Sequence, residues 1–151
     1  MMTWQWCELT ELSTHQWYAI VAARLAVFVV EQNCPYQELD GWDLRATHLI
    51  AWHDDKVAAY LRCFAPGVKW PEASLGRILT TQAFRGTGIG RDLVARGLAR
   101  IDATFPRSPV RIGAQAHLEK FYGSFGFVVA SDPYLEDGIP HIEMLRGVAN
   151  G

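Results

Sequence analysis

The glycine-rich segment 85–90 has the composition best suited to binding a phosphate. It reads Arg85-Gly86-Thr87-Gly88-Ile89-Gly90 and is followed by Arg91. The apolar, β-branched run 75–81 before it predicts a strand, and apolar residues recurring every three to five positions over 89–105 predict a helix. Backbone N–H groups at a helix start bind anions, and glycines let a ligand come close to them. The segment therefore predicts a site for a phosphate-bearing ligand.

The glycine spacing excludes two common phosphate-binding motifs. A dinucleotide fingerprint Gly-x-Gly-x-x-Gly beginning at Gly86 would need a glycine where the chain has Arg91. The P-loop pattern would need its Gly-Lys-Ser/Thr where the chain reads Arg91-Asp92-Leu93. The ligand is thus expected to be something other than these two kinds of nucleotide.

Two motifs together resemble the acyl-CoA-binding motifs of the GNAT superfamily of N-acetyltransferases. Arg-x-x-Gly-x-Gly at 85–90 is similar to its pyrophosphate loop. Tyr-x-x-x-Gly-Phe at 122–127 is similar to its second acetyl-CoA motif. A Phe-Tyr pair on a helix, such as Phe121-Tyr122, is alone more often part of a core. Two motifs in the expected order, each in the expected element, argue against coincidence.

Three further segments, 27–37, 113–118 and 136–142, look like the ElaA-type branch of this superfamily. With the two motifs they cover most of the chain. The resemblance implies an acyltransferase, and it brings no defined acceptor with it.

The resemblance also implies acetyl-CoA as co-substrate, held between two splayed strands. Backbone groups of Ile78, Leu79 and Thr80 would pair with the pantetheine arm as an added strand does. Backbone N–H groups of 85–90 would hold the pyrophosphate, and Arg85 or Arg91 would add a charge-assisted bond. Gln115 stands where many relatives carry asparagine, which leaves its contact with the cofactor an open question.

The expected reaction is direct attack of an amine on the thioester carbonyl, which needs a proton acceptor and a proton donor. By its place in the motif, Tyr122 is the candidate general acid. Glu31 and His141 are the candidate bases, with His141 also a candidate substrate contact. Asp40, His48 and His117 are weaker choices for the base, and water can relay the proton instead.

Acidic residues gather in segments 31–43 and 132–143, while 85–120 is rich in arginine. We therefore expect a cationic amine acceptor, either a small molecule or a peptide or protein amine. Arg24, Arg62 and Arg77 are weighed as substrate contacts or structural anchors. Tyr36, Trp42 and Tyr134 are weighed as an aromatic wall for the amine, with packing as the commoner role of such residues.

The elements that must position these residues follow from the apolar pattern. Strands are expected at 4–9, 48–53, 56–64, 75–81, 110–114, 127–130 and 139–145. Helices are expected from the N-cap Ser13 to about 28–31, over 89–105, and around 118–125. The order predicts an α/β (α+β) domain with a mixed sheet of about six to seven strands and helices on both faces. This order matches the GNAT fold with its splayed cofactor groove.

Composition limits the alternatives. The 151 residues, 50% of them hydrophobic, are expected to form one domain, 1–151, with its core at about 4–147. A net charge of −2 gives no drive toward nucleic acid or an anionic membrane. Three scattered cysteines lack metal-ligand spacing, so no metal is expected, and the start of the chain lacks a signal-peptide pattern, which favours the cytoplasm.

Two other functions stay open at this stage, as does the oligomeric state. One is a non-catalytic acyl-CoA-binding sensor or interaction module on the same fold, although the intact Tyr122 argues against it. The other is transfer to the amine of S-adenosylmethionine, against which the short chain argues. Both a monomer and a homodimer are compatible with the sequence.

Overall fold

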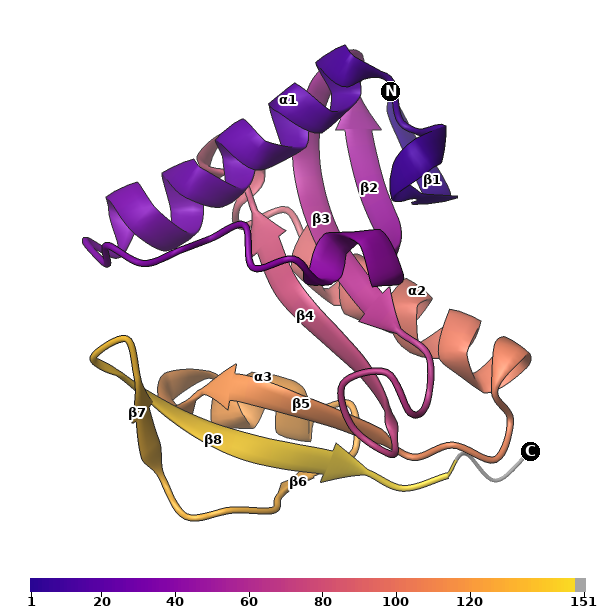
Figure 1. The fold of residues 1–151 in the computed structure, drawn as a ribbon, viewed down its shortest axis with the longest axis vertical. Helices are drawn as coiled ribbons and strands as arrows, with labels where there is room; N and C mark the ends of the chain where they lie inside the picture. Colours follow the sequence, from indigo (N-terminus) through magenta and orange to yellow (C-terminus); the bar gives the residue numbers. More distant parts are fainter. Residues whose placement is uncertain (149–151) are drawn as a thin grey trace.

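Eight strands form one mixed sheet in the order β1-β2-β3-β4-β5-β8-β6, with β7 paired to β8 (Figure 1). The computed structural model describes residues 1–148. Only the β4–β5 pair is parallel among these strands. Their bounds are β1 Met2–Glu8, β2 Thr47–His53, β3 Lys56–Phe64, β4 Ala73–Thr80, β5 Val110–Gln115, β6 Phe127–Val129, β7 Tyr134–Glu136 and β8 Ile139–Arg146.

The mixed sheet and all seven predicted strands are confirmed. The structure has one further strand, β7, that was not predicted. Segment 134–136 lies between two predicted strands and was not itself predicted as one, but it pairs antiparallel with the start of β8 around the turn at Asp137-Gly138. Both turn residues have positive φ, 51° and 78°, as tight hairpin turns require.

Helices cover both faces of the sheet. α1 (Thr14–Arg24) lies on one face, while α2 (Ile89–Thr104) and α3 (Glu119–Gly123) lie on the other (Figure 1). Successive strand residues point to opposite faces, so Tyr60 of β3 packs in the cluster with α1 and Leu61 in the cluster with α2. α2 buries the face predicted for it, including Ile89, Leu93, Val94, Leu98 and Ile101.

The first helix begins at Ser13, as predicted. The Ser13 hydroxyl accepts from the Gln16 N–H at 3.0 Å, and the Gln16 side chain accepts from the Ser13 N–H at 2.9 Å. α1 then continues into a π-helical turn, η2 (Leu25–Glu31). The helical segment therefore ends at Glu31, within the predicted range 28–31. Short 3-10 turns lie at Leu9–Glu11 (η1), Trp42–Arg45 (η3), Gln82–Phe84 (η4) and Ala116–Leu118 (η5).

The sheet opens between β4 and β5. These strands pair only at Ala73–Val110 and Ser74–Arg111 and then diverge (Figure 1). A bulge at Arg77, where φ is 50°, shifts the β3–β4 register just beyond the point of divergence. No helix within residues 1–148 is long and apolar enough to span a bilayer.

Candidate functional site

A cavity of about 620 Å³ lies where β4 and β5 part. Its walls come from η2 and the loop after it, from β4 and β5, from α3, and from the β7–β8 turn. The structure brings eight of the predicted site residues to this one cavity: Glu31, Ile78, Leu79, Thr80, Arg85, Gln115, Tyr122 and His141. Beyond Ser74, the edge of β4 that faces the cavity has no strand partner among the described residues.

The glycine-rich segment turns the chain from η4 into α2. Gly86 and Gly88 have φ of 78° and 85°, a region that residues with a Cβ adopt only at a cost. Gly88 is the N-cap of α2, and no side chain within residues 1–148 caps this helix start. The first-turn N–H groups of a 16-residue helix are therefore free to bind an anion.

The two arginines that flank these glycines have different partners. Arg85 lies at the cavity, with its Nη1 2.8 Å from Glu31 Oε2 and its Nε donating to the Thr80 carbonyl at 3.2 Å. Arg91 turns toward α3, with its guanidinium 4.9 Å from the Phe125 ring centroid. Arg85 is thus the one of the two that lines the cavity.

Tyr122 projects from α3 into the cavity wall and is 6% exposed. Edge-to-face contacts with Phe121 and Phe127, at centroid distances of 5.1 and 6.1 Å, fix its ring. Burial raises the pKa of Tyr122 above its ordinary value of 10.0, so the phenol keeps its proton at neutral pH.

His141 is oriented by two polar neighbours. Its Nδ1 lies 2.8 Å from the Ile139 carbonyl oxygen, which can only accept, so Nδ1 is the donor in this contact. Glu136 Oε2 lies 3.3 Å from Nε2, and the Tyr134 ring stacks on the imidazole at 5.9 Å. Both ring nitrogens of His141 thus face acceptor oxygens.

Comparison with known proteins agrees with this geometry. The family description "Acetyltransferase (GNAT) domain" matches residues 13–146. This chain belongs to the GNAT family. It is 44% identical to ElaA of Escherichia coli K12 over 150 residues, 98% of each chain. An acyl-CoA N-acyltransferase from Pseudomonas aeruginosa superposes with a TM-score of 0.92 at 42% identity, covering 97% of this chain and 100% of the other. The crystal structure of E. coli ElaA gives 0.90 at 43% identity, covering 97% and 99%. The ElaA-type resemblance is confirmed.

Two polar contacts join the walls of the groove in this GNAT protein. The Gln115 amide donates to Gln32 Oε1 at 3.2 Å, and the Cys34 thiol donates to the Asp137 carbonyl at 3.2 Å. Gln115, whose contact with the cofactor was left open, bonds to Gln32, and neither Gln32 nor Cys34 was predicted as a lining residue. The partners in these two hydrogen bonds are 83 and 103 residues apart in the sequence, so no local sequence pattern predicts either contact.

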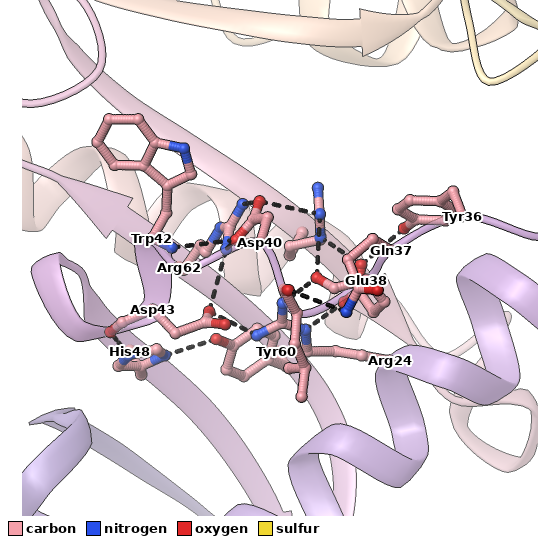
Figure 2. A network of polar contacts seen from close by, with 12 residues as sticks. Arg24, Tyr36, Gln37, Glu38, Asp40, Trp42, Asp43, His48, Tyr60 and Arg62 are labelled. Carbon is pink, nitrogen blue, oxygen red and sulfur yellow. Dashed lines mark hydrogen bonds and ion pairs between the residues drawn. The ribbon is translucent and has the colours of Figure 1, made fainter.

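A buried ion network anchors the loop between η2 and β2 (Figure 2). Arg24, which is 0% exposed, pairs with Glu38 and, at 2.6 Å, with Asp43. Arg62 pairs with Asp43 at 3.0 Å and with Asp40 at 2.7 Å. Burial alone would raise the pKa of Asp40, but hydrogen bonds and charge from Arg62 outweigh it and hold that pKa well below its ordinary value.

Arg77 joins the same network from the bulge in β4, because its Nε lies 2.6 Å from Glu38 Oε1. Of the three arginines weighed as substrate contacts, Arg24 and Arg62 therefore serve as structural anchors. Arg77 is both an anchor and a lining residue of the cavity. Buried arginine–carboxylate pairs cannot be recognised from the sequence, because arginines on helices and strands are usually solvated.

Of the three weaker candidates for the base, two line the cavity and one lies away from it. Asp40 and His117 line the cavity. His48 is 0% exposed and away from it, with Nδ1 2.5 Å from the Tyr60 hydroxyl and Nε2 3.0 Å from the Asp43 carbonyl (Figure 2). Within residues 1–148 no group of three or more His, Cys, Asp or Glu side chains is placed to hold a metal ion.

The three aromatic residues weighed as one wall do not gather. Tyr36 lines the cavity beneath the Arg77 guanidinium, at 5.6 Å. Trp42 packs edge-on against Phe64 at 6.0 Å, while Tyr134 stacks on His141. Each aromatic side chain thus has its own partner, and a single aromatic wall made of these three is wrong.

Proposed function

We propose that this protein is an N-acyltransferase that moves the acetyl group of acetyl-CoA to a primary amine by direct attack. The observation that carries the proposal is that one cavity is lined both by the unpaired edge of β4 and by the buried phenol of Tyr122. The β4 edge at Ile78, Leu79 and Thr80 suits an extended pantetheine arm. The uncapped start of α2 at 86–90 suits the pyrophosphate, with Arg85 beside it.

In this mechanism the amine nitrogen attacks the thioester carbonyl, the C–N bond forms and the C–S bond breaks. Tyr122 donates its proton toward the departing sulfur. His141 Nε2 accepts a proton from the attacking amine, and Glu136 stabilises the imidazolium. Glu31 is the less suited base, because its carboxylate is paired with Arg85.

We further propose that the acceptor amine is cationic and enters beside the β7–β8 turn. All four carboxylates of segment 31–43 are already paired with arginines: Glu31 with Arg85, and Glu38, Asp40 and Asp43 within the buried network. Among the carboxylates that line the cavity, Asp137 is the one outside the ion pairs of residues 1–148 and is left for an incoming ammonium, while Glu136 lies against His141.

Two measurements test the proposal: calorimetric binding of acetyl-CoA, and release of free CoA thiol with a panel of cationic, neutral and acidic amines. Saturable binding and amine-dependent thiol release are the expected results, with the cationic amines fastest. Binding without turnover on any amine would favour a non-catalytic acyl-CoA sensor. Absence of binding would contradict both functions.

A further inference from the structure

The chain contains few amines that an acyl thioester could modify. Its 14 basic residues include only three lysines: Lys56, Lys69 and Lys120. Within the described chain, Lys69 is the lysine that lines the cavity, where the other basic residues are arginines and histidines. A guanidinium stays protonated in proteins and so is not a nucleophile, whereas a lysine amine becomes one once it loses its proton.

Aromatic rings hold the Lys69 ammonium at the cavity. Nζ lies 5.5, 5.5 and 5.7 Å from the ring centroids of Trp42, Phe64 and Trp70. None of the ion pairs found among residues 1–148 involves Lys69. Ring faces attract an ammonium and so favour its charged form over the neutral amine. Lys69 is an exposed residue, and desolvation with the charge of Arg62 lowers its pKa, while the carboxylates of Asp40 and Glu136 oppose the shift.

The loop that carries Lys69 leans over one wall of the groove. A Gly67 N–H to Trp70 carbonyl hydrogen bond of 2.8 Å folds it between β3 and β4. The Trp70 ring lies next to β5, where a Cβ on Gly113 would be in ordinary contact with it at 3.9 Å. Asp40 and Glu136 line the same cavity as Lys69. The Lys69 amine therefore shares its cavity with the β7–β8 turn, where we propose that the acceptor enters.

From this placement we propose that Lys69 is a self-acylation site, a lysine that the protein acetylates in its own acceptor pocket. The proposal rests on the acetyltransferase activity proposed above. The Lys69 nitrogen attacks the thioester carbonyl, the C–N bond forms and the C–S bond breaks. The amine proton passes to His141 or to water, and the sulfur takes its proton from Tyr122. The products are Nε-acetyl-Lys69 and free CoA.

Self-acylation gives the site a way to limit its own activity. The acetamide is uncharged and larger than the ammonium, so it occupies acceptor space and removes the cation–π contacts. An external amine competes with Lys69 for the same acyl group. A good acceptor should therefore protect Lys69 from modification.

The test is intact-mass and peptide mass spectrometry of the full chain after incubation with acetyl-CoA. Lys56 and Lys120 are exposed side chains away from the cavity and serve as internal controls for chemical acetylation. We expect Lys69 to be modified at least about tenfold faster than either, because intramolecular placement raises the effective concentration of the amine. Its rate should not depend on protein concentration.

Variants separate self-acylation from adventitious chemistry. Lys69→Arg should lose the fast modification, the matched change Lys120→Arg should keep it, and Tyr122→Phe should slow it. Equal modification of all three lysines, or no modification of Lys69, overturns the inference. If the amine panel is turned over while Lys69 stays unmodified, only this inference fails. If neither is acetylated, the proposed function fails as well.

Discussion

At the scale of single residues, the role of Tyr122 depends on its hydroxyl and not on its ring. Tyr122→Phe keeps the packing on Phe121 and Phe127, so the free energy of unfolding and the acetyl-CoA affinity should change little. The turnover number should fall about 100-fold, the usual order for losing a general acid. Steady-state kinetics and calorimetry check this, and an unchanged kcat would show that another group protonates the sulfur. Because burial raises the pKa of Tyr122 above 10.0, its ionisation should cause no loss of rate below about pH 10.

The two candidate bases can be distinguished by their partners. Glu31→Gln preserves shape and hydrogen bonding to Arg85, and we expect kcat within about twofold of the unmodified protein. His141→Gln removes the nitrogen that faces Glu136, and kcat/KM should fall about 100-fold. Kinetics of both variants with the best amine of the panel decide between them. The opposite order of effects would assign the base to Glu31.

At the scale of elements, the turn into α2 depends on a backbone conformation that only glycine adopts easily. Gly88 has φ of 85°, so Gly88→Ala should lower the free energy of unfolding by about 1 kcal/mol and weaken acetyl-CoA binding. Gly90→Ala is the matched control, because its φ is not positive and a Cβ there would meet Thr80 Cγ2 at an ordinary 3.5 Å. Urea denaturation of both variants measures the difference. Equal stability of the two would contradict the conformational argument.

The elements could be predicted from sequence where the signal is local. The strands β2 to β5 and the helix α2 each carry a periodic apolar pattern, and the cofactor-side residues sit within two short motifs. β7 has only three residues and no apolar run, and the π-helical geometry of η2 leaves no mark in the apolar spacing. The acceptor side could not be predicted because its contacts join distant segments, as Cys34 and Asp137 do. Lys69 was missed because a single charged residue in a turn is usually solvated.

At the scale of the whole molecule, the groove separates two bodies of the sheet. Strands β1–β4 lie with α1 and α2, and β5–β8 lie with α3 (Figure 1), while one hydrophobic cluster joins the two, from Leu98 of α2 to Ile112 of β5 and Ile142 of β8. The ion network fastens the loop of 36–43 to the first body, so the acceptor wall is built on buried charge and not on a mobile loop (Figure 2). Such pairs tolerate loss of one partner poorly, because the remaining charge stays buried.

His48 makes the stability of this arrangement depend on pH. Burial lowers the pKa of His48 from 6.5, with the charges of Arg24 and Arg62 adding to the effect and Asp43 opposing it. His48 is therefore neutral in the folded state at pH values where the unfolded chain already binds a proton. Below about pH 6.5 the unfolded state holds more protons, so the free energy of unfolding falls as the pH falls.

The slope from His48 should not exceed about 1.4 kcal/mol per pH unit, the value for one proton. Asp40 does not contribute in this range, because its lowered pKa gives stability that is lost only below its ordinary value of 3.8. Thermal unfolding between about pH 7.5 and about pH 5.5 measures the slope. His48→Gln, which can still hydrogen-bond to Tyr60 or to the Asp43 carbonyl, should flatten it, while His15→Gln on the exposed face of α1 should leave it unchanged. If His48→Gln keeps the full slope, the proton is taken up elsewhere and His48 is not the group that links pH to the stability of the acceptor wall.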